Sequence, residues 1–184
     1  MRLNHLLRKI ASGAPAPASG SAAAAAVGAA AALVQKVATL SGKQWSEAAA
    51  AHDRAEQLRL RSEELVEEDS LAYLAFLDAA RSGQDLDSAR NRTIDVPLEI
   101  VRTAAEVARL AHLLGEKGNQ NLRVDASVAS ILATAAAESA ALLVKVNLPR
   151  ESRDARLREA RRLAREAKAL GSLTASADSP RRAR

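Results

Sequence analysis

One acidic side chain, Asp69, lies on what the sequence predicts to be an apolar face of a helix. Counting by four residues, it shares this face with three residues of types that line protein cores, namely Leu65, Tyr73 and Leu77. A carboxylate in such surroundings is costly unless it is hydrogen-bonded or paired, and burial raises its pKa towards a range that suits proton transfer. Asp69 is therefore the candidate acid/base. The alternative is a position at the edge of the face, in water.

A loop of proline and small residues, residues 15–21, leads directly into an alanine-rich helix and reads PAPASGS. Free backbone N–H groups and the positive end of the helix dipole make a helix beginning suitable for an anion or a polarised carbonyl. The candidate binding residues in this loop are Ser19, Gly20 and Ser21. The alternative is an ordinary helix start that is capped by Ser19 or Ser21.

A second loop, residues 118–121, reads GNQN and precedes a further apolar helix. Asn119 lies within this loop, and Arg123 and Asp125 follow at the predicted helix start. These three residues are candidates for the same kind of binding as the first loop. The alternative is structural, because an acidic residue at a helix beginning is also a normal partner of the helix dipole.

The composition excludes several kinds of catalytic site. The chain has no cysteine, so thiol nucleophiles, thiolate metal sites and disulfides are excluded. Its three histidines have no neighbour at the spacing of a metal site, and the glycine motifs of dinucleotide and P-loop sites do not occur. We expect neither a metal site nor a nucleotide-binding site.

The elements that must position these residues are helices. Alanine is the commonest residue, and the aromatic residues are Trp45, Tyr73 and Phe76 alone. Alanine favours helix strongly but fills little space, so each helix contact buries little area. This composition predicts an all-α, single-domain helical bundle with long antiparallel helices, and oligomerisation that enlarges a thin core.

Six helices are predicted from the apolar periodicity and the breaks between apolar segments. They cover residues 4–12, 22–40, 46–80, 85–114, 124–146 and 151–170, and no strand pattern occurs. Ser46 is the expected cap of the third helix. Pro97 lies inside the fourth helix and is expected to kink or divide it.

Positive charge is concentrated at the C-terminal end. Residues 150–184 carry 11 Lys/Arg and 5 Asp/Glu, a net charge of +6 in a chain whose total is +5. We expect a helical domain at 1–170 and a basic, disordered tail at 171–184. Nucleic-acid binding is unlikely for this tail because the basic residues lack interleaved aromatics. The apolar run 22–34 is too short to span a bilayer, so we expect a cytoplasmic protein without a membrane partner.

Five short motifs follow one another between Leu3 and Arg165. They are the loop 15–21 with its alanine-rich helix, Asp69 four residues before Tyr73, VPL at 96–98, Gly118-Asn119 with Asp125, and VNL at 146–148. Together they resemble the cyclodeaminase/cyclohydrolase family of one-carbon folate enzymes. This family includes the C-terminal domain of formiminotransferase-cyclodeaminase and free-standing methenyltetrahydrofolate cyclohydrolases.

The resemblance implies an all-helical homodimer that needs no cofactor and takes a tetrahydrofolate derivative as its substrate. The reaction would be hydrolysis of 5,10-methenyltetrahydrofolate or cyclodeamination of 5-formiminotetrahydrofolate. By the match of motifs, Asp69 would be the acid/base. The folate would be held by Ser19, Gly20, Ser21, Asn119, Arg123, Asp125 and Asn147.

The chain departs from the family pattern at several of these motifs. Ala18 and Ser19 stand where the family has glycines, Val124 stands in place of serine, and Leu143 in place of asparagine. Glycine allows close approach of a ligand to the backbone, which alanine restricts. The alternative function is therefore that of a catalytically degenerate family member, a helical dimeric interaction protein.

Overall fold

The computed structural model describes residues 2–149 and 152–177, the last six of them by their backbone only. Within these residues the regular elements are helices, which confirms the all-α prediction. They are α1 (Leu3–Ile10), α2 (Ser19–Thr39), α3 (Ala48–Ser82), α4 (Leu86–Lys117), the 3-10 turn η1 (Gln120–Leu122), α5 (Arg123–Asn147) and α6 (Ala155–Ala177).

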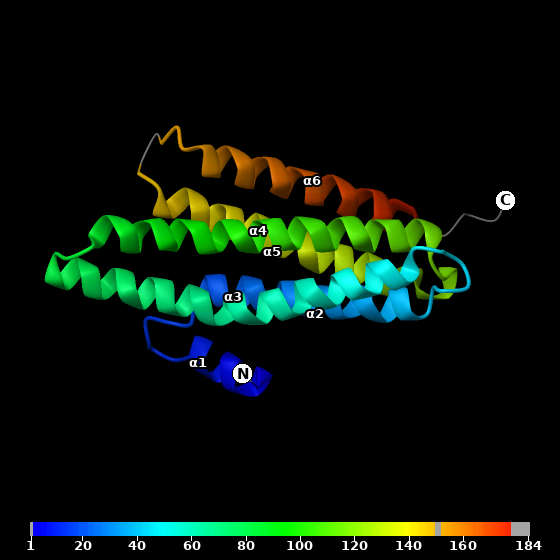
Figure 1. The fold of residues 1–184 in the computed structure, drawn as a ribbon, viewed down its shortest axis with the longest axis horizontal. Coiled ribbons are helices and arrows are strands. Elements are labelled where there is room, and N and C mark those ends of the chain that lie inside the picture. Colours follow the sequence, from blue (N-terminus) through cyan, green and yellow to red (C-terminus); the bar gives the residue numbers. More distant parts are fainter. Residues whose placement is uncertain (1, 150–151, 178–184) are drawn as a thin grey trace.

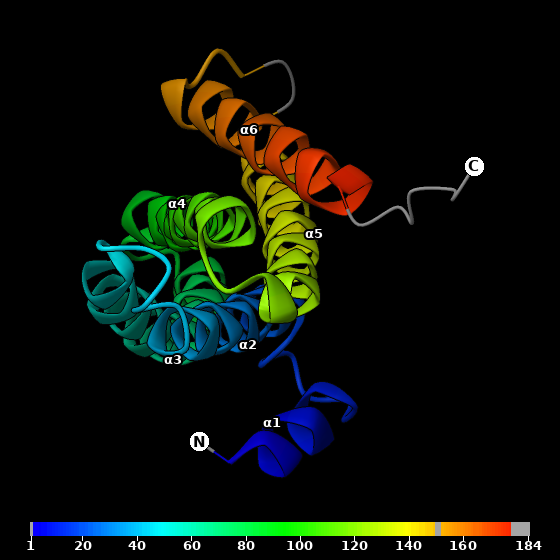
Figure 2. The same cartoon turned by 90° about the vertical axis from the view of Figure 1, so that its right-hand side faces the viewer.

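Helices α2 to α5 run up and down beside one another and form the body of the bundle (Figure 1). The end-on view shows α6 lying over α4 and α5, and α1 below α2 (Figure 2). Helix α1 contacts the core through Leu6, which is buried. The hairpin of α3 and α4 is the longest part, and its tip extends past the beginning of α2 and the end of α5 (Figure 1).

The core is built from small and β-branched residues. Many alanines of α2, α4 and α5, such as Ala24, Ala104 and Ala137, have no exposed surface, and the largest fully buried side chains include Leu65, Ile100 and Leu114. Because alanine adds little thickness to a helix, the helices can pack closely with few bulky side chains. The two helices of highest apolar content, α2 and the segment Gln120–Asn147, have the length and hydropathy of a membrane span, a property that core helices of bundles share.

The turn between α3 and α4 depends on left-handed backbone. Gly83 has φ of 73° and its N–H donates to the carbonyl of Ala79 at 2.9 Å, which closes α3. Asp85 follows with φ of 53°, a conformation that aspartate tolerates better than most residues. This short connection forces α4 to return directly alongside α3.

The predicted serine caps are wrong. Ala18 precedes α2 without a side-chain cap, and α3 begins at Ala48 after Glu47 instead of being capped by Ser46. Ser19 and Ser21 lie inside the first turn of α2, and Ser21 is fully buried. The hydroxyl of Ser21 is turned towards α3, where it finds hydrogen-bond partners, so it is not free to close the helix.

The last helix starts and ends later than predicted. Asp154 caps α6, because its Oδ1 accepts a hydrogen bond from the N–H of Arg156 at 2.8 Å. The helix continues through Gly171 to Ala177, where we expected it to stop at residue 170. A Cβ on Gly171 would lie 2.8 Å from Oγ1 of Thr134, so this glycine serves close packing against α5. Residues 178–184 of the predicted tail lie outside the described residues.

Helix α6 is attached to α4 by ion pairs in which arginines of both helices take part. Arg102 of α4 binds Glu159 at 2.8 Å, and Arg109 binds Glu166 at 2.7 Å. Arg156 pairs with Asp154 and with Asp95 of α4. These ion pairs join α6 to α4 along its length.

Candidate active site

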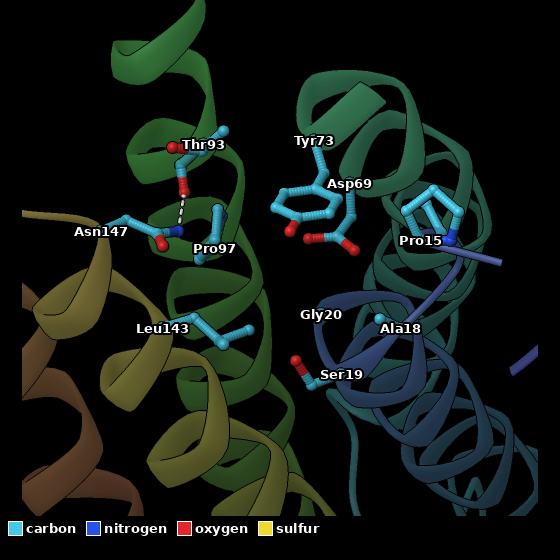
Figure 3. A pocket seen from close by; sticks show the side chains of 11 residues that line it. Pro15, Ala18, Ser19, Gly20, Asp69, Tyr73, Thr93, Pro97, Leu143 and Asn147 are labelled. Carbon is cyan, nitrogen blue, oxygen red and sulfur yellow. Dashed lines mark hydrogen bonds between the residues drawn. The ribbon is translucent and has the colours of Figure 1, made fainter. Parts of the chain in front are cut away.

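A pocket of about 250 Å³ lies between the beginning of α2, the middle of α3, the N-terminal half of α4 and the end of α5 (Figure 3). Four of the predicted site residues line it, namely Ser19, Gly20, Asp69 and Asn147. The pocket therefore gathers residues from four separate helices around one carboxylate.

Asp69 lies against the first turn of α2 because Gly20 has no side chain. A Cβ on Gly20 would overlap the Asp69 carboxylate, with Oδ2 only 2.7 Å away. Alanine at this position is incompatible with the present position of the carboxylate. Gly20 thus serves the close approach of a side chain from another helix, which is a packing requirement that only glycine meets.

Ser21 contacts the same carboxylate from the interior of the bundle. Its Oγ lies 3.0 Å from Oδ2 of Asp69, 2.9 Å from the carbonyl oxygen of Val66 and 3.0 Å from Oγ of Ser70. A hydroxyl has one proton to donate and can accept others, so Ser21 can serve either a charged or a protonated Asp69. Ser21 is fully buried, and its contribution is to orient Asp69.

The pKa of Asp69 is raised above its ordinary value. The main cause is burial, which disfavours the charged carboxylate, and the hydrogen bonds from the side chain and backbone of Ser21 offset part of the effect. Asp69 differs in this respect from three other carboxyl groups of the described residues. The pKa values of Glu68, Asp154 and Glu159 are lowered, because each of these groups has an arginine partner. A raised pKa keeps a larger fraction of the carboxyl group protonated near neutral pH, so that the group can donate a proton.

Tyr73 does not belong to the core, contrary to expectation. It is 42% exposed and lines the pocket one helical turn beyond Asp69. Figure 3 shows its ring beside the carboxylate, at the same side of the pocket. Tyr73 shares a helix face with Asp69, as inferred from the sequence, but this part of the face lines the pocket instead of the core.

Pro97 and Asn147 are joined through Thr93. Proline has no N–H, so the carbonyl of the residue four positions earlier loses its helical partner. That carbonyl belongs to Thr93, and Nδ2 of Asn147 donates to it at 2.6 Å (Figure 3). Helix α4 consequently runs through Pro97 without being divided.

Leu143 lies one turn before Asn147 on α5 and also lines the pocket. Its apolar side chain occupies the wall opposite Gly20 and Ser19 (Figure 3). Ala18 and Ser19 line the same pocket, so three of the departures from the family pattern are in contact with the site.

The second predicted loop is not part of this pocket. Asn119 donates to the carbonyl of Leu40 at 3.2 Å and accepts from the N–H of Asn121, while its own N–H donates to Ser41. Asp125 pairs with Lys36 at 2.9 Å. Ser19 lies 17 residues before Lys36 on the same helix, so the two loops are about 25 Å apart.

The expectation of a single cleft formed by both helix beginnings is therefore wrong for one chain. The reason is topological, because α2 and α5 are antiparallel neighbours and their beginnings lie at opposite ends of the bundle. Asn119, Arg123 and Asp125 remain predicted binding residues without a site in the single chain. The sequence motifs give the order of these residues but not their side-by-side placement.

The sequence contained a signal for one contact that we did not use. Thr93 precedes Pro97 by four residues, so its carbonyl must find a partner outside the helix. A long-range donor such as an asparagine amide could have been anticipated from that alone. Pro15 and Ala16 also line the pocket, and both belong to the loop 15–21 that the sequence singled out.

Comparison with known proteins agrees with this arrangement. A family model described as formiminotransferase-cyclodeaminase matches residues 2–167. The chain is 35% identical over 182 residues to a methenyltetrahydrofolate cyclohydrolase of Methylorubrum extorquens, with 88% of each chain covered. The fold matches the crystal structure of formiminotetrahydrofolate cyclodeaminase from Thermotoga maritima with a TM-score of 0.83 and 23% identity, covering 96% of this chain and 92% of that one.

The match therefore extends over the whole bundle, from α1 into α6, and includes the helices that build the pocket around Asp69. The chain belongs to the formiminotransferase-cyclodeaminase family, a family of one-carbon folate enzymes.

Proposed function

We propose that this protein is a one-carbon folate enzyme that hydrolyses the methenyl bridge of 5,10-methenyltetrahydrofolate, with Asp69 as the acid/base. The proposal is supported above all by the half-buried carboxylate of Asp69 at the pocket wall, oriented by Ser21. The cyclohydrolase relative favours this reaction over cyclodeamination of 5-formiminotetrahydrofolate, because it is the more similar of the two in sequence.

The reaction requires proton transfers and no covalent intermediate with the protein. Water adds to the methenyl carbon, and a base accepts the proton that the water loses. The resulting tetrahedral carbon, which bears a hydroxyl group, expels one of its two nitrogens, and this nitrogen takes up a proton as the C–N bond breaks. The hydroxyl group loses its proton to water as the C=O bond of the formyl product forms. A carboxyl group with a raised pKa can serve both steps in turn, first as carboxylate and then as acid.

Replacing Asp69 by asparagine tests this role. Asparagine keeps the shape of the side chain and removes the titratable carboxyl group, so we expect kcat for methenyltetrahydrofolate hydrolysis to fall by about 10²- to 10⁴-fold. The matched control is Asp78→Asn, an exposed aspartate on the same helix, for which we expect wild-type rates. Absence of turnover in the wild type, together with no folate binding by calorimetry, would overturn the proposal.

The alternative function is that of a non-catalytic interaction protein. It is favoured by one observation, the apolar Leu143 in the pocket wall where the family pattern has asparagine. Folate binding with no turnover by any variant would support this alternative.

A further inference from the structure

Two hydroxyl groups in series connect Asp69 to the side of α3 that faces away from the pocket. Oδ2 of Asp69 lies 3.0 Å from Oγ of Ser21, which in turn lies 3.0 Å from Oγ of Ser70. Either serine can be the donor in the contact between them, so the direction of these hydrogen bonds can reverse. Ser21 and Ser70 are called the hydroxyl chain below.

The hydroxyl chain ends beside a second cavity. This groove of about 400 Å³ lies between α1, α2 and α3, and it is lined on the α3 side by Glu63, Val66 and Glu67 among others. Ser70 follows these three residues by seven, four and three positions, so it lies on the same face of α3, at the end of the groove. Ser70 is partly exposed, whereas Ser21 is fully buried. Ser70 is therefore the point at which the hydroxyl chain reaches water.

The hydroxyl chain has one complete arrangement for each protonation state of Asp69. A protonated Asp69 donates to Ser21, which donates to Ser70, and Ser70 donates outward. With a charged Asp69, Ser70 donates to Ser21 and Ser21 donates to the carboxylate. Passage from the first arrangement to the second moves one proton from Asp69 to the outer end and leaves each hydroxyl with one proton. The carbonyl oxygen of Val66, 2.9 Å from Ser21 and 3.3 Å from Ser70, can accept from both hydroxyls while they turn back.

The proposed reaction releases a proton inside the pocket. The methenyl bridge is an amidinium group with one positive charge, and the formyl product is neutral at this position, so hydrolysis releases one proton per turnover. Asp69 is again a carboxylate once it has protonated the departing nitrogen. It can then accept the proton that the hydroxyl group of the tetrahedral carbon has given to water.

Asp69 is well placed to be the base that takes this proton. Among the described residues that line the pocket, the other side chain that can ionise is Tyr73, and α2, α4 and α5 contribute none. A ligand that fills a pocket of about 250 Å³ keeps bulk water away from the carboxylate on this side. A proton that leaves while the ligand is bound needs a route on the other side, where the hydroxyl chain lies.

The charges at the outer end favour the departure of a proton. Arg59 and Glu63 form an ion pair at the groove, and Glu67 adds a second, exposed carboxylate. Together these three residues carry a net negative charge, which attracts a proton from Ser70. Water or the carboxylate of Glu67 can accept the proton there.

We propose that the hydroxyl chain carries the proton released by hydrolysis from Asp69 to the groove beside α1 while the folate occupies the pocket. Ser70 is thus a positioning residue, which acts through Ser21 and Asp69 without touching the folate. This role rests on the proposed hydrolysis of methenyltetrahydrofolate.

Two variants of the same shape test this role. Valine and threonine differ little in volume, and threonine alone keeps a hydroxyl group. We expect Ser70→Val to lower kcat by about tenfold, less than the roughly 10²- to 10⁴-fold expected for loss of the acid/base itself. KM should stay near the wild-type value, because Ser70 does not line the pocket. Ser70→Thr, the matched control, should retain most of the wild-type kcat.

The response to buffer separates proton transfer from a structural effect. A small base such as imidazole can accept the proton at the mouth of the pocket. Raising its concentration at constant pH and ionic strength should therefore restore the kcat of Ser70→Val towards the wild-type value. The kcat of the wild type and of Ser70→Thr should not depend on imidazole. Each rate is measured after subtraction of the hydrolysis that occurs in buffer without protein.

Equal kcat values for Ser70→Val and Ser70→Thr in an active enzyme would overturn the proton route. A lowered kcat of Ser70→Val that imidazole does not raise would also overturn it, because Ser70 would then serve only the shape of the site. An inactive wild type would overturn the proposed hydrolysis itself, and with it the need for a proton route. The two failures are thereby distinguishable.

Discussion

Asp69 depends on two small residues of α2 for its position. Gly20 provides the space for the carboxylate, and Ser21 provides the hydroxyl that orients it. Neither residue needs to touch the substrate to matter for the reaction. Substitutions of Gly20 or Ser21 should therefore change the position of the acid/base carboxylate.

Gly20→Ala should displace Asp69 from the first turn of α2, because the new Cβ would overlap the carboxylate. We expect kcat to fall by about tenfold to a hundredfold, since misplacement of a reacting group by about 1 Å has effects of that size. The measurement is steady-state hydrolysis of methenyltetrahydrofolate, with far-UV circular dichroism to confirm the fold.

Gly42→Ala is the matched control for this substitution, because a Cβ on Gly42 meets nothing within 4 Å. Equal rates for Gly20→Ala and wild type would show that Asp69 can move without loss, and would contradict the positioning role of Gly20.

At the scale of single residues, the sequence predicted Asp69 as the acid/base candidate but not the residues that contact it. The four-residue spacing from Leu65 placed Asp69 correctly on a partly buried face, because helical periodicity is a local property. The serines were taken as caps, which is their commonest use at helix starts, whereas Ser21 bonds to α3. A contact between residues 48 positions apart in the sequence depends on tertiary packing, which local patterns do not contain.

At the scale of elements, α4 tolerates Pro97 because α5 replaces the missing helical hydrogen bond. The amide of Asn147 donates to the carbonyl of Thr93, which a residue other than proline at position 97 would satisfy from within α4. The end of α5 is thereby fixed to α4 at the pocket wall. The two helices should be coupled energetically through these residues.

Asn147→Ala leaves the Thr93 carbonyl without its donor and should destabilise the fold by about 1–3 kcal/mol. In a Pro97→Ala background, the new N–H at position 97 can bond to Thr93, so Asn147→Ala should cost less there. A double-mutant cycle in urea, with four unfolding curves, measures the difference. Additive effects of the two substitutions would contradict the coupling.

The existence and order of the helices were predictable, whereas several ends were not. Apolar periodicity and the glycine and proline breaks predicted the body helices to within a few residues. The end of α6 was misplaced because Gly171 reads as a stop in a linear pattern. In the structure it permits contact with Thr134, which is a property of two packed helices.

At the scale of the whole molecule, ion pairs and the pocket carboxylate have opposite effects on stability as pH changes. Hydrogen bonds from Arg61 lower the pKa of Glu68, and those from Arg102 lower the pKa of Glu159. Their stabilisation is present above the ordinary carboxyl range and is lost as pH falls through their folded-state pKa values. The raised pKa of Asp69 works in the other direction, because the fold prefers its protonated form.

Asp69→Asn should therefore raise Tm, or leave it unchanged, at pH 7, where the wild type must hold a partly desolvated charge. Below the ordinary Asp pKa of about 4 both side chains are neutral, so the difference in Tm should disappear. Thermal unfolding of both proteins between about pH 3 and pH 8 checks this trend. A Tm of Asp69→Asn well below that of the wild type at pH 7 would show that the charged carboxylate stabilises the fold.

The antiparallel order of the helices was predictable in outline, but its effect on the site was not. Short connections such as Gly83–Asp85 imply that consecutive helices reverse direction. Three such reversals make α2 and α5 antiparallel, but these helices are not consecutive, and only the three-dimensional arrangement shows that they are neighbours.

The tip of the α3–α4 hairpin extends beyond the first residue of α2 and the last residue of α5. The pocket occupies the space that those two helices leave by stopping short of their neighbours. The volume of the pocket therefore depends on the lengths of α2 and α5. One additional turn on either helix, about 5.4 Å, would fill the pocket. Conversely, trimming a turn would enlarge the chamber without altering a single residue of the hairpin, so helix length offers a route by which relatives could accommodate bulkier molecules on the same scaffold.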